Sequence, residues 1–212
     1  MTNQCNLWHR SNFGANRALL AVVLIGIASF AMPLSAVADA NEQSASQLHP
    51  AKQTTLGLYV TSREAYEKWQ ASPETVTIID VRTPEEFMFI GHADMAWNIP
   101  LAAQSYDWDT EKQQFPMSPL PDFVARVQSV AGPDDILLVT CRSGGRSAMA
   151  VNLLAKAGFV NVYNITDGVE GDAVKDPNSV FNGQRLVNGW KNSGLPWTYQ
   201  VDPERRVVPA QR

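Results

Sequence analysis

The sequence is poor in the residue types from which disulfide frameworks and metal centres are built. Its 212 residues include 2 cysteines, Cys5 and Cys141, and 3 histidines. This composition excludes a disulfide scaffold, and we expect no transition-metal site and no cofactor. A basic tract is also missing: Lys and Arg number 17 against 21 Asp and Glu, for a net charge of −4. The chain therefore lacks the positive surface that nucleic-acid binding requires.

The one long apolar run lies near the N-terminus. Arg10 and Arg17 precede an unbroken apolar stretch at 18–30, and Ala36-Val37-Ala38 supplies a small-x-small pattern. We predict that residues 1–38 are a signal peptide cleaved after Ala38. The protein is then expected to be periplasmic or secreted, with no membrane attachment after cleavage. The alternative is an uncleaved anchor, for which the apolar stretch is short.

Loss of the signal peptide removes Cys5 and leaves Cys141 as a lone thiol. Such a thiol is either free and reactive or paired between chains. With no second cysteine to resolve a disulfide, a thioredoxin-like oxidoreductase is disfavoured.

The remaining sequence predicts one α/β domain at 56–200, after a flexible leader at 39–55 and before a polar tail at 201–212. Apolar strand-like runs alternate with helical segments, which is typical of a parallel sheet flanked by helices. Two helices begin with capping boxes, at Thr61 and at Thr83. Residues 102–119 show no period and are expected to form a long loop.

Cys141 occupies the most informative position. It follows the apolar run 136–140 and begins the segment Cys-Arg-Ser-Gly-Gly-Arg-Ser at 141–147, which leads into a predicted helix at 147–157. Backbone N–H groups at a helix start, together with Arg142 and Arg146, favour an anionic sulfur and an anionic substrate. The alternative is a buried structural cysteine, which needs neither the arginines nor the glycines.

Three blocks of sequence resemble the rhodanese-like sulfurtransferase family. The first is Asp80-Val81-Arg82 with Glu86-Phe87, Gly91-His92 and Asn98-Ile99-Pro100, and the second is the loop 141–147. The third is Asp167-Gly168-Val169 with the closing segment 189–196. The resemblance implies a three-layer fold with a central parallel sheet.

Two departures from the family pattern stand out. Met95 occupies a position where the family usually has glycine, and residues 172–188 split the closing segment. The split is expected to form an insertion near the site, because it begins after the strand that follows the Cys141 helix.

The resemblance also implies a chemistry. Cys141 would take a sulfane sulfur from a donor such as thiosulfate, form a persulfide, and pass the sulfur to a thiol or to cyanide. Backbone N–H groups of the loop would cradle the persulfide. Arg146 either faces the substrate or turns inward to pair with an acid such as Asp80. The candidate site residues are Cys141 as nucleophile; Arg142, Ser143, Gly144, Gly145 and Arg146 around the substrate; and Asp80, Arg82 and Ser147 as supporting groups.

Two other functions stay open. Phosphatases and arsenate reductases on the related fold use C-x5-R, whereas Cys141 and Arg146 form C-x4-R. A module that carries or senses sulfur without turnover would keep the same loop. Its protein partner would bind through 102–119 or 172–188.

Overall fold

The computed structural model describes residues 48–207 of the chain. The predicted signal peptide, most of the leader and residues 208–212 lie outside this range. Within it, no helix has the length and apolar character needed to cross a membrane.

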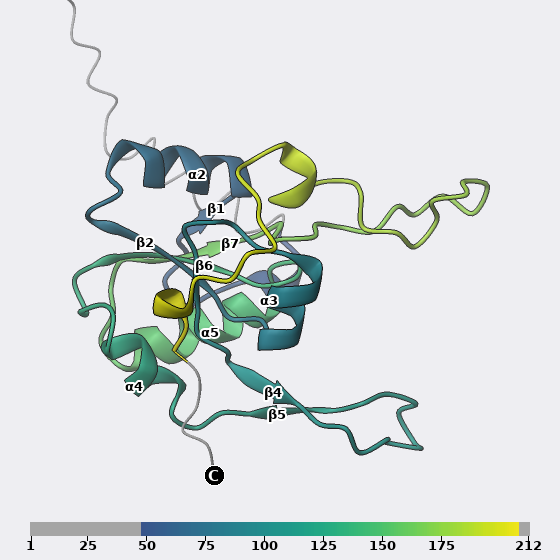
Figure 1. Cartoon of the computed structure of the whole chain (residues 1–212), viewed down its shortest axis with the longest axis horizontal. Helices are drawn as coiled ribbons and strands as arrows, with labels where there is room; N and C mark the ends of the chain where they lie inside the picture. Colours follow the sequence, from purple (N-terminus) through teal and green to yellow (C-terminus); the bar gives the residue numbers. More distant parts are fainter. Residues whose placement is uncertain (1–47, 208–212) are drawn as a thin grey trace, which may run out of the picture. The chain divides into compact units, whose positions relative to one another are not determined.

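A five-stranded sheet forms the centre of the fold (Figure 1). The strand order is β1-β7-β6-β2-β3, and every neighbouring pair is parallel. This is the predicted parallel α/β sheet. The strands are β1 (Tyr59–Val60), β2 (Val76–Asp80), β3 (Trp97–Asn98), β6 (Ile136–Thr140) and β7 (Val162–Ile165).

The central strands are buried on both faces because their side chains alternate between two cores. Ile79 and Val139 pack with α4 (Phe123–Gln128) and α5 (Gly145–Lys156) on one face. Ile78 and Leu138 pack with α2 (Ser62–Ala71) and α3 (Pro84–Ile90) on the other. Burying such a side chain contributes about 1.5–3 kcal/mol, so both helical layers are held against the sheet.

Both predicted capping boxes are present. The Thr61 side chain accepts the backbone N–H of Glu64, and Glu64 accepts the Thr61 N–H. Thr83 and Glu86 make the same reciprocal pair at the start of α3, where Pro84 occupies the first turn. These local bonds satisfy donors that a helix start otherwise leaves free, so each helix begins where the sequence indicates.

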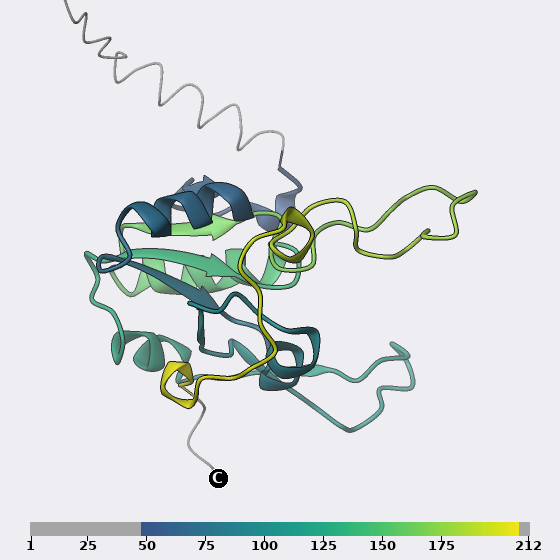
Figure 2. The same ribbon diagram turned by 45° about the horizontal axis from the view of Figure 1, so that its top comes forward.

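Residues 102–119 differ from the long loop that the sequence predicts. They form a hairpin, in which β4 (Ala102–Gln104) pairs antiparallel with β5 (Met117–Pro119). Strands of three residues are too short to display a period, which explains the wrong prediction. We call residues 102–119 the hairpin arm and residues 172–188 the insertion arm. Both project from the same side of the domain (Figures 1 and 2).

The described part of the expected flexible leader is bonded to the domain. Residues 50–52 form the 3-10 helix η1 (Pro50–Lys52), and the N–H of Thr55 donates to Asn152 of α5 at 2.8 Å. The start of the polar tail is also attached: it forms η3 (Pro203–Arg205), and Arg205 donates to the carbonyl of Met95 at 2.7 Å. The ordered domain is therefore longer than 56–200.

Candidate functional site

The loop that carries Cys141 lies at the carboxyl end of the central strand β6. The strand ends at Thr140, and α5 begins at Gly145. Gly144, the N-cap, has φ 95°, and a Cβ there would collide with the Thr166 carbonyl. A Cβ at Gly168 would lie 2.6 Å from the Cys141 carbonyl oxygen. Both positions therefore require glycine, and the loop is held tightly against the end of β7.

The thiol of Cys141 is buried at 1% exposure beneath this loop. Its Sγ accepts the backbone N–H of Gly144 at 3.2 Å, and the hydroxyl of Ser147 lies 3.3 Å away. The sulfur thus lies at the start of α5, where N–H groups without helical partners favour negative charge. Of the backbone N–H groups that the sequence predicts around the sulfur, that of Gly144 donates to it, and the wider cradle stays a prediction.

Asn164 on β7 is a buried side chain that binds the Ser147 hydroxyl. It is not among the site residues predicted from the sequence. Its Nδ2 donates to the carbonyl of Lys52 at 2.9 Å and to that of Gly144 at 3.1 Å. Its Oδ1 accepts from Ser147 Oγ at 2.6 Å. The Ser147 hydroxyl has a single proton, and it donates that proton to Asn164 in the shorter of its two contacts. The backbone N–H of Gly144 is therefore the group that donates to the Cys141 sulfur.

Asp80 and Arg82 form a buried ion pair beside the loop. Arg82 Nη2 lies 2.6 Å from Asp80 Oδ2, both side chains are 0% exposed, and Arg82 also donates to the Gly91 carbonyl. Burial lowers the pKa of Arg82, but the charge and hydrogen bonds of Asp80 outweigh it and raise that pKa above its ordinary value. Asp80 pairs with Thr140 across the sheet, which places this ion pair next to Cys141. Its supporting role stays a prediction.

Arg146 turns inward, but its partner is Glu86 and not the Asp80 that the sequence suggested. Its two terminal nitrogens donate to the two carboxylate oxygens of Glu86, each at 2.6 Å. Burial raises the pKa of Glu86, but the hydrogen bonds and charge of Arg146 outweigh it and lower that pKa below its ordinary value. In the sequence, Glu86 stands out as a capping residue and as part of the first family block, but not as a partner of Arg146. Its second role depends on the packing of α3 against the loop.

Arg142, the other arginine of the loop, is exposed. Its side chain makes no hydrogen bond or ion pair with the part of the chain that the structure describes. Of the two predicted anion-attracting arginines, Arg142 is therefore the one whose guanidinium is available.

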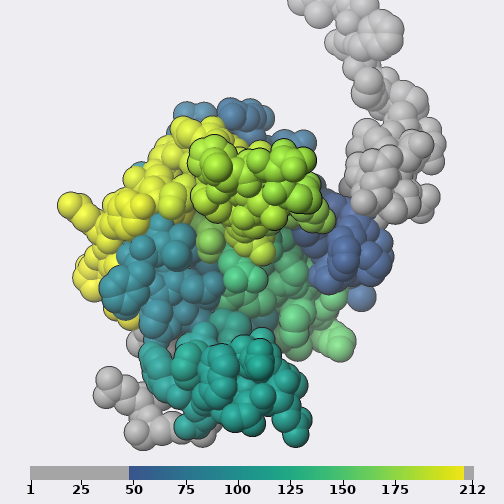
Figure 3. All heavy atoms as spheres, turned by 90° about the vertical axis from the view of Figure 1, so that its right-hand side faces the viewer, coloured from purple at the N-terminus to yellow at the C-terminus, as the bar shows by residue number. Residues whose placement is uncertain are grey.

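The two arms flank the end of the domain that carries the loop. Figure 3 looks at this end, with the insertion arm in yellow-green above, the hairpin arm in teal below, and a green surface between them. A groove of about 760 Å³ lies on the insertion side, where Ser143 of the loop meets residues of 48–52 and 172–187. The insertion therefore lies beside the site, as the sequence predicts.

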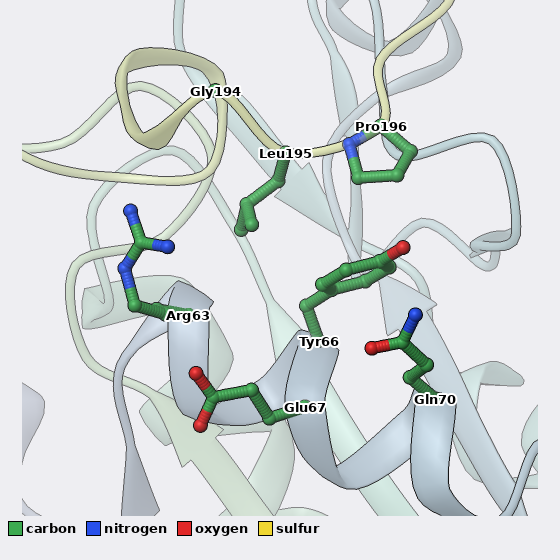
Figure 4. A pocket seen from close by; sticks show the side chains of 7 residues that line it. All are labelled: Arg63, Tyr66, Glu67, Gln70, Gly194, Leu195 and Pro196. Atoms are coloured by element: carbon green, nitrogen blue, oxygen red, sulfur yellow. The ribbon is translucent and has the colours of Figure 1, made fainter.

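A second pocket, of about 580 Å³, lies elsewhere. Arg63 and Tyr66 of α2 face Gly194, Leu195 and Pro196 across it (Figure 4). None of its lining residues belongs to the loop 141–147. It is therefore separate from the Cys141 loop.

Comparisons with known proteins agree with this geometry. The model of the Rhodanese-like domain family matches residues 62–173, more than half of the chain. Thiosulfate sulfurtransferase 16, chloroplastic, of Arabidopsis thaliana is 42% identical over 118 residues, which cover 56% of this chain and 76% of that protein. An uncharacterized protein of Rickettsia conorii is 31% identical over 144 residues, covering 66% of this chain and 96% of its own. The crystal structure of Rv0390 from M. tuberculosis superposes with a TM-score of 0.51 at 26% identity, covering 66% of this chain and 96% of that one.

Proposed function

The chain belongs to the rhodanese-like domain family, and on that basis we propose that it is a sulfurtransferase whose nucleophile is Cys141. The observation that carries the proposal is the position of the Cys141 sulfur. It lies at the end of β6, on a loop that opens α5, and accepts a backbone N–H at 3.2 Å. A thiolate held this way is an activated nucleophile.

The proposed reaction has two steps. The Cys141 thiolate attacks the outer sulfur of thiosulfate, the S–S bond of the donor breaks, and sulfite leaves with the electron pair. Cys141 then carries a persulfide. A thiolate or cyanide attacks the outer sulfur of this persulfide, the S–S bond to Cys141 breaks, and the Cys141 thiolate is regenerated.

The loop residues divide these tasks. Arg142 is exposed and is proposed to attract the donor anion. The N–H groups of Ser143, Gly144 and Gly145 are proposed to cradle the persulfide. Arg146 is bound through both terminal nitrogens to Glu86, so we assign it to positioning of the loop.

The same ion pair weighs against a phosphatase. Phosphate-gripping arginines use both terminal nitrogens on the phosphate oxygens, whereas those of Arg146 already bind Glu86. The C-x4-R spacing from Cys141 is also one residue shorter than the C-x5-R of those enzymes.

A sulfur carrier that serves a protein partner is the second candidate. It is favoured by the aromatic residues exposed on the hairpin arm, where Tyr106, Trp108 and Phe115 are at least half exposed. Exposed aromatic groups of this kind are enriched at protein interfaces.

Intact-mass spectrometry separates the two candidates. We expect the protein to gain one sulfur atom from thiosulfate, and to lose it repeatedly to a small thiol when both are present. Cys141→Ser is the matched control and should gain no sulfur while retaining its fold. Loading without repeated discharge would favour the carrier, and sulfur on the Ser variant would contradict Cys141 as the nucleophile.

We further propose that the protein is exported, since the basic start, the apolar run at 18–30 and Ala36-Val37-Ala38 form a signal-peptide pattern. N-terminal sequencing of protein from the native host should begin at Asp39 or Asn41. A sequence that begins at Met1 or Thr2 would contradict export by cleavage.

A further inference from the structure

The groove beside Ser143 is built by two segments that are far apart in the sequence. One wall comes from the N-terminal residues 48–52, and the other from the insertion arm. Lys52 Nζ joins the two walls through an ion pair with Asp172 at 3.2 Å. This pair spans 120 residues of sequence, so the groove depends on the insertion as well as on the family fold.

The groove is cationic in a protein that is acidic as a whole. Its ionisable lining residues are Lys52, Lys175, Arg185 and Asp172, together with His49. With His49 neutral these side chains carry a net charge of +2, whereas the whole chain carries −4. Anions are therefore drawn to this face of the site, since a local excess of one sign raises the concentration of the opposite ion.

Hydrogen bonds fix the position of Asp172 in the lining of the groove. Asn188 accepts the N–H of Asp172 at 2.7 Å and donates to its carboxylate at 3.1 Å. Burial raises the pKa of Asp172, but the bonds from Asn188 and Lys52 outweigh it and lower that pKa below its ordinary value. Asp172 therefore stays charged and holds Lys52. Arg185 donates to the Gly171 carbonyl at 2.6 Å, which orients its guanidinium.

Lys175 is left as an available cation. It is exposed and makes no hydrogen bond or ion pair with the described residues. Arg185 makes no ion pair within the range 48–207, although its charge acts on the carboxylate of Asp172. A ligand can therefore reach Lys175 and Arg185 without breaking an ion pair of either side chain.

The size of the groove indicates which reactant it serves. Its volume of about 760 Å³ lies within the range of roughly 300–1,000 Å³ that holds drug-sized ligands. Thiosulfate, with two sulfur and three oxygen atoms, would leave most of this space empty. An acceptor with a thiol at one end and charged groups at the other could use both the loop residue Ser143 and the cations that line the groove.

We propose that this groove binds the acceptor, and that the acceptor is a small thiol bearing carboxylates. This inference rests on the proposed sulfurtransferase function. The carboxylates lie against Lys175 and Arg185 while the thiolate reaches past Ser143 to the outer sulfur of the Cys141 persulfide. The S–S bond at Cys141 breaks, the acceptor leaves as a persulfide anion, and Cys141 returns to the thiolate.

Single-turnover discharge of the preloaded persulfide tests the proposal. Mercaptosuccinate, which has two carboxylates, is compared with 2-mercaptoethanol, which has none. For each thiol, the rate with a variant is divided by the rate with the unmodified protein. We expect Lys175→Glu to slow discharge by mercaptosuccinate about three- to tenfold and to leave 2-mercaptoethanol unaffected. Added salt should slow only the mercaptosuccinate reaction of the unmodified protein.

Lys156→Glu is the matched control, because Lys156 is an exposed lysine in the last turn of α5, away from the loop. It should discharge both thiols at the normal rate. Equal rates for Lys175→Glu and the unmodified protein with mercaptosuccinate would overturn the proposal, as would an equal loss with both thiols. Slower loading by thiosulfate with normal discharge would assign the groove to the donor and overturn it too. Failure of the unmodified protein to load at all would instead contradict the proposed function.

Discussion

The two arms leave the same end of the domain and differ in what they bring to it. The hairpin arm carries exposed aromatic side chains, Tyr106, Trp108 and Phe115, and three acidic residues with one lysine between 105 and 116. The insertion arm places Lys175 and Arg185 in a cationic groove. The hairpin arm thus combines exposed aromatic groups with acidic residues, whereas the insertion arm contributes two cations to the groove and also exposes apolar side chains such as Val180 and Phe181.

Different contacts link the two sides of the domain to the Cys141 loop. On the hairpin side, Arg146 lies 3.9 Å from the sulfur of Met117 and binds Glu86. On the insertion side, Asn164 joins the Lys52 carbonyl to the loop. Under the proposed function, we therefore expect changes on the insertion side to affect sulfur transfer and changes on the hairpin side to affect the position of the loop. Substitutions that remove the contacts of each side separately test this difference between the two sides.

The largest effect is expected from Asn164→Ala on the insertion side. The change leaves the carbonyl of Lys52 without its Asn164 donor, removes one of the two donors to the buried carbonyl of Gly144, and frees the hydroxyl of Ser147. We expect the free energy of unfolding to fall by about 2–3 kcal/mol and sulfur loading to slow about tenfold. Urea denaturation and single-turnover mass spectrometry measure the two effects.

Asn161→Ala is the matched control for this change. Asn161 donates from an exposed position to the Asp134 carbonyl, away from the loop. It should cost under about 1 kcal/mol and leave loading unchanged. If Asn164→Ala lowered stability alone, with loading as fast as in the control, Asn164 would be structural and not a positioning residue.

Glu86→Gln on the hairpin side is expected to have the next largest effect. It removes the charge that holds Arg146, so we expect a loss of about 1–2 kcal/mol at pH 7. The pKa of Glu86 is lowered by folding, so its stabilisation is present above the unfolded value of 4.5 and is lost as pH falls through the folded value. The difference between the two proteins should therefore shrink below about pH 4.

Urea unfolding at pH 7 and at pH 3 measures this prediction. Glu67→Gln is the control, since Glu67 is an exposed α2 residue with no hydrogen bond among the described residues. A difference that stayed constant down to pH 3 would show that Glu86 acts through packing and not through its charge.

The smallest effect is expected from Trp108→Ala on the hairpin arm. Trp108 is 52% exposed and contacts Phe115 edge-on, with ring centroids 5.1 Å apart. We expect turnover with thiosulfate and mercaptosuccinate to change by less than about twofold. The matched change on the other arm is Lys175→Glu, so steady-state assays of the two variants side by side compare the arms directly. A large loss in the Trp108 variant would remove the distinction between them.

The elements that could be predicted from the sequence are those set by local bonds or by continuous apolar runs. The capping box at Thr83 requires only Glu86, three residues away. The strand at 136–140 is recognisable because its residues form a continuous apolar run. The strand–loop–helix around Cys141 was predictable for the same reason. Such signals lie within a few residues of one another.

Contacts between distant segments could not be predicted. Arg146 and Glu86 lie 60 residues apart, and their pairing depends on how α3 lies against the Cys141 loop. In the sequence, Asn164 is a single polar residue within an apolar strand. No nearby sequence pattern indicates that it contacts Ser147 or Lys52. The order of the strands is likewise set by packing, since alternation alone predicts only that they run parallel.

The insertion arm begins and ends at two glycines in close contact. Gly171 and Gly189 approach so closely that neither backbone has room for a Cβ, and both have positive φ. The two ends of the excursion thus meet at one point on the domain, and the cost of closing a loop there rises only slowly with its length. Peptides of other lengths and charges could therefore replace the insertion arm between Gly171 and Gly189. Such replacements offer a way to design rhodanese-like domains that prefer other ligands.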